Sequence, residues 1–401
     1  MKQVKSMTVR PMLPGIRAIE AEMIELRRQL HAYPELSLKE FKTSDLVAAK
    51  LESWGFEVHR GIGGTGVVGR LQQGCGSKVI GIRADMDALP IQEQTGLPYS
   101  SQHPGAMHAC GHDGHTAMLL AAAQHLANSR QFDGTLVVIF QPAEESDGGA
   151  QKMLDDGLLE RFPCNALFGM HNMPGLPVGK LGFRAGPFMA STDTVEIRID
   201  GTGGHGGMPH KAIDPILTGG AIVMALQSIV SRNTDPLETA VITVGSFHSG
   251  EAPNVIPGHA VLQLCVRALK PNVRADLLKR IVQVAQAQAL SFGASVSVEV
   301  DREESLPPLI NDPQLTAFAR QVAVDWLGEE GVIQDMAPIA ASEDFAVMLE
   351  HCPGSYLFIG NGDGKGGCMV HNPGYDFNDD CLGTGASYWV RLVEQFLVRA
   401  G

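Results

Sequence analysis

Side chains that can bind metal ions are concentrated in a few short segments of this chain. Cys110, His112 and His115 lie in the segment MHACGHDGH, residues 107–115. Further candidates follow downstream: Glu144, Glu145, His171 and His371. Thiolates, imidazoles and carboxylates are the usual ligands of zinc and related ions. Because a bound divalent ion beside a spare carboxylate activates water, a hydrolytic enzyme is the first hypothesis.

The number of candidate ligands predicts a dinuclear centre. The set combines one sulfur, three imidazoles and one carboxylate: Cys110, His112, Glu145, His171 and His371. If one member bridges two ions, the set provides three contacts to each ion, and a shared water completes the coordination. A bridging Cys110 thiolate favours zinc, manganese, cobalt or nickel over magnesium or calcium. We therefore expect two divalent ions per subunit, with His115 in a supporting or core role rather than as a ligand.

The adjacent carboxylates Glu144 and Glu145 predict a division of labour. Neighbouring residues at the end of a strand point in different directions. We therefore assign Glu145 as a metal ligand and Glu144 as the general base that takes a proton from water and passes it to the leaving amine. The alternative, two solvated loop glutamates, is disfavoured by the apolar strand before them. For Asp87 we predict that it orients a ligand imidazole, with a capping or turn role as the alternative.

Alternating strands and helices would place these residues at one edge of a sheet. Three short apolar runs are typical of buried strands: Val67–Val68, Val79–Ile82 and Thr135–Phe140. Helical spacing occurs at 16–30, 38–54 and 116–127. The pattern predicts an α/β fold with a mixed, mainly parallel sheet flanked by helices. Asp87, Glu144 and His171 then follow strand ends, where such sheets build their sites.

The sequence pattern changes near Gly186, which predicts a second domain. A chain of 401 residues exceeds what one core usually organises. Thr194–Asp200 alternates apolar and polar residues like a half-buried antiparallel strand, and a helix is expected at 213–231. We predict a smaller α+β insert at 186–300. The catalytic domain is then discontinuous, 1–185 and 301–401, because His371 must return to the metal ions.

Three residues of the predicted insert are candidates for contacts with the substrate. His205 lies in a glycine-rich turn, where an imidazole donor could stabilise an oxyanion, although a structural role is the alternative. Asn254 and Arg267 are flanked by strand-like sequence and could hold a substrate carboxylate. The alternative for both Asn254 and Arg267 is that they are ordinary polar residues of the protein surface.

Composition restricts the class of partner. The formal net charge of −13 disfavours nucleic acid and anionic membranes, which require clustered lysine and arginine. We expect no membrane span, because no uninterrupted apolar run approaches the required length, and the start MKQVKS lacks the apolar segment of a secretory signal. Seven scattered cysteines favour reduced thiols over a disulfide framework. A cytoplasmic location is therefore expected.

Several long motifs resemble the dinuclear-metal amidohydrolases that include hippurate hydrolase, N-acyl-amino-acid deacylases and indole-acetyl-amino-acid hydrolases. This group is a branch of the aminoacylase and carboxypeptidase superfamily. The motifs are HAYPE at 31–35, RADMDALP at 83–90, HACGHDGH at 108–115 and HNPGYDFN at 371–378. The resemblance implies the same five ligands and the same base, Glu144. It also implies that His205 polarises the scissile carbonyl, reaching a neighbouring subunit through a dimer formed by the inserted, lid-like domains.

Two departures limit what the resemblance transfers. Other branches of the superfamily have His-x-Asp where this chain has Arg83-Ala-Asp85, so their metal identities are not carried over. Leu264-Cys265 stands where many relatives have Gly-Thr, which leaves the carboxylate-binding role of Arg267 open.

The predicted reaction is hydrolysis of the amide bond of an N-acyl-amino acid by metal-activated water, releasing a carboxylic acid and a free amino acid. The substrate is therefore a small N-acyl-amino acid or a short peptide, and a homodimer or higher homo-oligomer is expected. The alternative enzyme is a dipeptidase or carboxypeptidase that uses the same dinuclear site. A non-catalytic metal-binding or scaffold protein is disfavoured by the spare base Glu144, since a structural site has closed coordination.

Overall fold

The computed structural model describes residues 12–363 and 368–399, which form two compact units. Of the described residues, the first unit comprises 12–186, Asn311–Ala337, 347–363 and 368–399, and the second comprises Pro187–Ile310 and Pro338–Ala346. The second unit therefore begins beside the predicted boundary at 186. It continues beyond the predicted boundary at 300 and takes in a later short segment.

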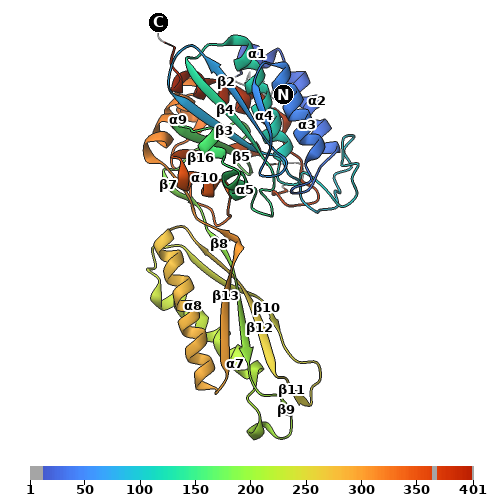
Figure 1. The fold of residues 1–401 in the computed structure, drawn as a ribbon, viewed down its shortest axis with the longest axis vertical. Coiled ribbons are helices and arrows are strands. Elements are labelled where there is room, and N and C mark those ends of the chain that lie inside the picture. The colour runs from blue at the N-terminus through green and yellow to red at the C-terminus, as the bar shows by residue number, and fades with distance from the viewer. Residues whose placement is uncertain (1–11, 364–367, 400–401) are drawn as a thin grey trace, which may run out of the picture. The chain divides into compact units, whose positions relative to one another are not determined.

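The first unit is built on an eight-stranded sheet in the order β1-β2-β4-β3-β5-β16-β6-β15. Figure 1 labels its strands β2, β3, β4, β5 and β16. The strands are β1 (Glu57–Ile62), β2 (Gly66–Gln73), β3 (Val79–Asp85), β4 (Gly134–Gln141), β5 (Ala166–Pro174), β6 (Leu181–Gly182), β15 (Val332–Ile333) and β16 (Gly354–Gly362). Strands β4, β3, β5 and β16 are parallel neighbours. Strand β2 pairs antiparallel with both β1 and β4. The predicted mixed, mainly parallel sheet is confirmed.

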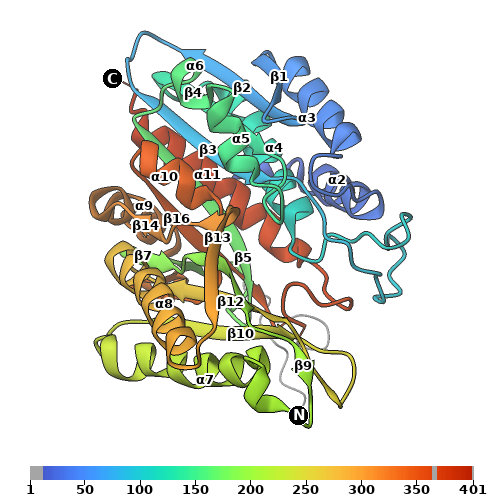
Figure 2. The same ribbon diagram turned by 60° about the horizontal axis from the view of Figure 1, so that its bottom comes forward.

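Helices pack against this sheet and bury its centre. They are α1 (Pro14–Arg17), α2 (Glu20–Ala32), α3 (Phe41–Ser53), α4 (His112–Ser129), α5 (Gly149–Asp155), α6 (Leu158–Arg161), α9 (Pro313–Leu327), α10 (Phe345–His351) and α11 (Leu382–Phe396). Figures 1 and 2 show α2 and α3 alongside α4. Helix α4 is buried along most of its length and also packs on α11. It is apolar nearly all round because it lies inside the unit.

A glycine sets the start of α4 and with it the position of the central histidine motif. The predicted helix at 116–127 begins earlier, at His112, because Gly111 takes the left-handed conformation with φ +96° immediately before it. A side chain there would also collide with Asn172 and Tyr375. The chain can turn this tightly only at glycine, so His112 becomes the first residue of the helix.

The second unit is a four-stranded antiparallel sheet, in the order β10-β12-β8-β13, covered by two helices. Its main elements are β8 (Thr192–Asp200), α7 (Pro215–Ser228), β10 (Ala240–His248), β12 (His259–Ala268), α8 (Pro271–Ser291) and β13 (Ser295–Leu306). Shorter strands are β7 (Gly186–Met189), β9 (Gly204–His205), β11 (Val255–Ile256) and β14 (Leu309–Asn311). Strand β8 alternates buried and exposed residues, as its sequence predicts.

Helix α7 shows how the second unit forms its core. The Asp214 carboxylate accepts hydrogen bonds from the first-turn N–H groups of Ile216 and Leu217, which caps the helix. Its buried side packs Ile222 and Leu226 against α8 and the sheet. The segment Pro215–Asn233 is also long and apolar enough, at mean hydropathy 1.2, to pass as a membrane-spanning helix by length and composition. The sequence analysis considered only uninterrupted apolar runs and did not predict this segment.

Candidate metal centre

The five predicted ligands come together in the first unit. Their ligand atoms form two groups, each within 4.8 Å: Cys110, His112 and His171, and Cys110, Glu145 and His371. Cys110 Sγ lies 3.2 Å from His171 Nε2, and Glu145 Oε1 lies 3.3 Å from His371 Nε2. Since Cys110 belongs to both groups, its thiol lies where a bridging ligand is required.

The elements of the fold explain how these side chains converge. His112 is the first residue of α4. Cys110 lies in the loop before the helix, separated from His112 by Gly111. Glu145 follows the end of β4, and His171 lies in β5, which β3 separates from β4 in the sheet. His371 has the left-handed φ of +65°, and its N–H donates to the carbonyl of Ala109 at 2.7 Å, which ties its segment to the histidine motif.

The residues present fit a divalent metal. His112 is fully buried, and its Nε2 atom has no hydrogen-bond partner among the described residues. This nitrogen lies 3.8 Å from Glu145 Oε1, on the side where the other ligand atoms gather. A buried polar atom without a partner is costly, so a cation at this point supplies the missing interaction. Sulfur and imidazole donors suit borderline ions.

Electrostatics also favour a positive charge at the centre. Burial lowers the pKa of His112, but Asp85 and Asp87 outweigh burial and raise it to about 10. Burial raises the pKa of the Cys110 thiol, and the nearby carboxylates of Glu145 and Glu144 raise it further. The contributions of the carboxylates to both shifts show acidic surroundings that attract positive charge, and a metal ion can take the place of the protons.

Asp87 has the geometry that its predicted orienting role requires. Its Oδ1 atom lies 3.2 Å from His112 Nδ1, and its backbone oxygen lies 2.9 Å from the same nitrogen. Nδ1–H therefore donates to Asp87, which leaves Nε2 facing the centre. Oδ2 accepts the Ser37 hydroxyl at 2.8 Å and the Glu145 N–H at 3.0 Å. One buried carboxylate thus holds two predicted ligands.

Glu144, the predicted base, lies beside the ligand atoms. Its Oε2 atom is 3.9 Å from His112 Nε2, and ligand atoms of Glu144, His112 and Glu145 all lie within 4.8 Å of one another. The preceding residue, Ala143, has the left-handed φ of +54°. A residue with a side chain adopts this conformation at a cost of about 1 kcal/mol or more, so neighbouring contacts must hold it.

His115 supports the cluster from behind. Its Nδ1 atom lies 2.6 Å from Asp85 Oδ1, and its Nε2 lies 2.7 Å from Asn172 Oδ1. The ring packs edge-on against His171, with centroids 4.6 Å apart. The Asp85 carboxylate in turn accepts from Arg83 Nη1 at 2.6 Å. Asp85, His112 and His115 also form a group that could hold an ion, but both ring nitrogens of His115 are already within hydrogen-bond distance of other groups.

Sequence reasoning missed a buried charge network around Asp113. His31 Nδ1 lies 2.8 Å from Asp113 Oδ2, and Arg27 Nη1 donates to Asp113 and, at 2.9 Å, to Asp376. The network ties the start of α4 to α2 and to the segment that follows His371. His31, Asp113 and Asp376 lie in the motifs HAYPE, HACGHDGH and HNPGYDFN, but the motifs did not show that these side chains contact one another.

The comparison with known proteins identifies the family. A model of peptidase family M20/M25/M40 matches residues 81–395. This chain belongs to that family. As an M20 family member, it is a metal-dependent amidohydrolase, and its clustered donors are candidate ligands for divalent ions.

Similar proteins share nearly the whole length of this M20 chain. Hippurate hydrolase of Campylobacter jejuni is 42% identical over 386 residues, covering 96% of this chain and 99% of the relative. N-acetyl-L-cysteine deacetylase of Bacillus subtilis is 39% identical, covering 94% and 88%. The crystal structure of YxeP from Bacillus subtilis, a dinuclear metal-binding peptidase from the M20 family, matches with TM-score 0.84 and 35% identity, covering 95% and 99%.

The remaining predicted site residues lie in the second unit of this M20 protein, outside the ligand groups. His205 and Asn254 are brought together, because β9 pairs with β11 and the Gly206 N–H donates to the Asn254 carbonyl at 2.8 Å. His205 is exposed, and its Nδ1 accepts the Gly207 N–H at 2.9 Å. Arg267 lies on β12 and donates from Nη1 to the carbonyl of Ala340 at 2.8 Å.

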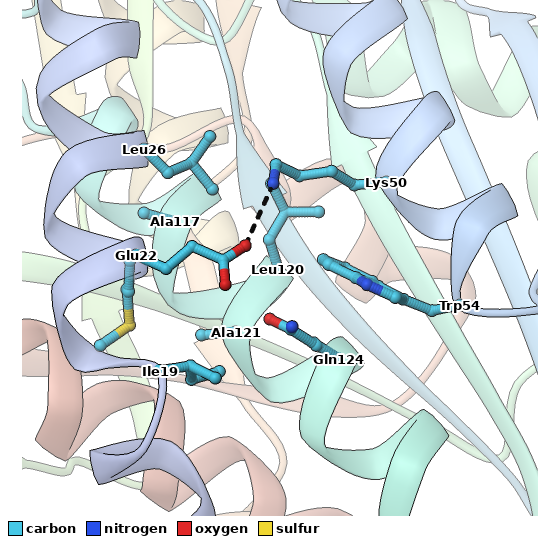
Figure 3. A pocket seen from close by; sticks show the side chains of 10 residues that line it. Ile19, Glu22, Leu26, Lys50, Trp54, Ala117, Leu120, Ala121 and Gln124 are labelled. Carbon is cyan, nitrogen blue, oxygen red and sulfur yellow. Dashed lines mark ion pairs between the residues drawn. The ribbon is translucent and has the colours of Figure 1, made fainter.

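A pocket between α2, α3 and α4 is separate from the ligand cluster (Figure 3). Glu22 and Lys50 form an ion pair of 3.5 Å across it, beside Trp54 and Gln124. Its volume of about 10 Å³ suffices for roughly one water molecule. None of the predicted site residues lines it, so this pocket is not a candidate active site of the M20 chain.

Proposed function

We propose that this protein hydrolyses the amide bond of small N-acyl-amino acids, producing a carboxylic acid and a free amino acid. The observation that carries the proposal is the position of Glu144 beside two ligand groups that share Cys110. A structural metal site has no need of a spare carboxylate, whereas a hydrolytic site does. The names of the relatives from Campylobacter and Bacillus, which act on hippurate and N-acetyl-L-cysteine, support this substrate class.

Two divalent ions per subunit fit the donor set, and zinc, manganese, cobalt or nickel is proposed because of the Cys110 thiol. His112 and His171 would hold one ion, Glu145 and His371 the other, with Cys110 between them. When bound, the ions polarise the scissile carbonyl and lower the pKa of water.

Glu144 moves the proton. Its carboxylate accepts a proton from water as the water oxygen forms a bond to the carbonyl carbon, and later delivers that proton to the amine nitrogen as the carbon–nitrogen bond breaks. The half-buried position of Glu144 beside His112 supports this role, because the base must reach the reacting water directly.

His205 is proposed to stabilise the oxyanion of the tetrahedral intermediate. Its Nδ1 accepts a backbone hydrogen bond, so in the neutral ring Nε2 carries the proton and can donate outward. Asn254, which immediately precedes β11, is suited to hold the substrate carboxylate. Arg267 is a further candidate for this contact, although one of its N–H groups is already bonded to Ala340.

A homodimer through the second unit is proposed, with His205 serving the neighbouring subunit. Strand β10 lies at an edge of the sheet, and α7 exposes Leu217 and Met224, which are 59% and 75% accessible. An open strand edge beside exposed apolar side chains favours association. Light scattering tests this proposal, since an active monomer would exclude a role for His205 across subunits. A cytoplasmic location is also proposed, on sequence grounds alone.

Replacing Glu144 tests the proposed function. Metal-loaded protein should hydrolyse N-benzoylglycine or N-acetyl-amino acids, and Glu144→Gln should lower kcat by roughly 10²–10⁴-fold while metal content is retained. Glu160→Gln, an exposed glutamate on α6, is the matched control and should leave kcat unchanged. Full turnover by Glu144→Gln would exclude it as the base. Faster turnover of dipeptides than of N-acyl-amino acids would favour the dipeptidase alternative.

A further inference from the structure

Glu40 places a buried carboxylate against the loop that carries the proposed base. Its Oε1 atom accepts the N–H of Ala143 at 2.9 Å, and its Oε2 accepts the Thr65 hydroxyl. Glu40 is 0% exposed. These contacts join the start of α3 to the end of β4, far away in the sequence, so the carboxylate serves a tertiary contact.

A local capping role does not account for this carboxylate. Glu40 is the N-cap residue of α3, yet its side chain makes no capping hydrogen bond in the described structure. Glu35 performs that task instead, because its carboxylate accepts the N–H groups of Lys42 at 3.2 Å and Thr43 at 2.9 Å. The same segment therefore contains one glutamate that stabilises the helix and another that contacts the site loop.

The loop that Glu40 contacts has a conformation that needs support. Ala143 has φ +54°, and its carbonyl accepts the Gly149 N–H at 2.9 Å. A side chain at Gly149 would lie 1.7 Å from the Pro142 carbonyl oxygen, which shows how tightly this turn closes. Because Glu144 comes next, the backbone angles of Ala143 set the direction in which the Glu144 side chain leaves the chain.

We propose that Glu40 is a positioning residue for Glu144, holding Ala143 in the left-handed conformation that directs the base toward the ligand cluster. The Asp87 carboxylate holds the following residue through the Glu145 N–H, so two carboxylates from different segments fix the backbone on both sides of Glu144. This inference rests on the proposed function only in taking Glu144 as the base.

Amide hydrogen exchange on the metal-loaded protein tests the structural half of the proposal. In Glu40→Ala the Ala143 N–H loses its acceptor, and exchange in a peptide covering 142–149 should accelerate at least tenfold. Glu35→Ala is the matched control, since it should accelerate exchange near Thr43 and leave 142–149 protected. Unchanged protection of 142–149 in Glu40→Ala would overturn the proposal.

Kinetics test the functional half. Glu40→Ala should lower kcat at least tenfold, with KM changed less than threefold and metal content unchanged, because the base is displaced while substrate and metal contacts remain. Glu40→Gln keeps an acceptor oxygen for Ala143 and should retain most of the kcat. Glu35→Ala should lower the melting temperature without lowering kcat.

The outcomes separate this inference from the proposed function. If Glu40→Ala does not fold, Glu40→Asp replaces it, since the shorter side chain withdraws the carboxylate from Ala143 and should lower kcat in the same way. If the wild type hydrolyses no N-acyl-amino acid, the proposed function fails, while hydrogen exchange still decides whether Glu40 holds the loop. A hydrolase that depends on Glu144 but keeps kcat within threefold in Glu40→Ala and Glu40→Asp would refute positioning.

Discussion

Replacing Asp87 with asparagine should weaken metal binding, because a single buried carboxylate supports two ligands. The amide provides one acceptor oxygen and one NH₂ donor. If the oxygen faces the Glu145 N–H, the NH₂ group faces His112 Nδ1 and opposes its donated proton. If the side chain is reversed, the Glu145 N–H faces a donor and loses its acceptor. Either orientation disturbs one ligand.

The expected size of the effect follows from the contacts that remain. Loss of a partner behind a metal ligand typically costs about 10–100-fold in affinity, or about 1.4–2.7 kcal/mol. The Asp87 backbone oxygen, 2.9 Å from His112 Nδ1, still accepts in the variant. This contact limits the loss, so Asp87→Asn should weaken binding by about 10–30-fold.

Competition for Zn²⁺ against a chromophoric chelator near neutral pH measures this effect. Burial raises the pKa of Asp87, but the charge and hydrogen bonds of its neighbours, His112 foremost, together lower it below its usual value, so the wild-type carboxylate is ionised in the assay. Ser37→Ala removes the hydroxyl donor to Oδ2 and the acceptor of the exposed Ser146 hydroxyl, and should change the affinity less than threefold. An Asp87→Asn protein that binds Zn²⁺ as tightly as the wild type would refute the orienting role.

Three further predictions concern stability. Removal of metal by a chelator should lower the melting temperature, and added Zn²⁺ should restore it. The reason is that an ion that binds only the folded state stabilises it by about 2.7 kcal/mol when the free ion concentration is a hundred times Kd. An unchanged melting temperature would contradict a metal site in the folded state. Burial lowers the pKa of His31, but its hydrogen bonds to Asp113 and Glu93 raise it to about 9 from 6.5. The stability that protonated His31 provides is therefore complete below pH 6.5, and on the order of 1–3 kcal/mol should be lost as pH rises to 9. Urea unfolding of metal-free protein should show this loss in the wild type and a flatter profile in His31→Gln, and equal profiles would refute it. Phe140 is fully buried in β4, so Phe140→Ala should lower the free energy of unfolding by about 3–5 kcal/mol, as measured by urea unfolding. The exposed control Glu160→Gln should leave this free energy unchanged.

The sequence predicted those parts of the fold that depend on local pattern. The apolar runs at 79–82 and 135–140 lie in the parallel strands β3 and β4, and the predicted helix at 116–127 lies inside α4. The run at Val67–Val68 was also read as a strand, but pattern alone did not reveal that β2 is antiparallel to β4. Strand direction depends on the partner, and the partner is not encoded in the run itself.

The candidate site divides in the same way. Residue types and motifs identified the five candidate ligands and Glu144. In the structure, the ligand atoms of these residues form groups whose members lie within 4.8 Å of one another. A supporting role was predicted for Asp87 and His115. None was predicted for Arg27, His31 and Glu40, because these residues contact Asp113 and Ala143 across long separations in sequence. A glutamate at a helix start predicts a cap, and only the tertiary structure shows that Glu40 has another partner.

The order of strands in the first unit has a consequence for synthesis of the protein. Strand β5 ends at Pro174, but β16, its neighbour on one side, begins only at Gly354. A ribosome adds about 5–20 residues per second, so the edge of β5 lacks its partner strand β16 for roughly 10–40 s while the second unit is synthesised. An uncovered strand edge invites pairing with other nascent chains. Yield in the cell should therefore depend on chaperones that shield β5 until the C-terminal strand emerges, and a circular permutant that encodes β16 before β5 should reduce that dependence.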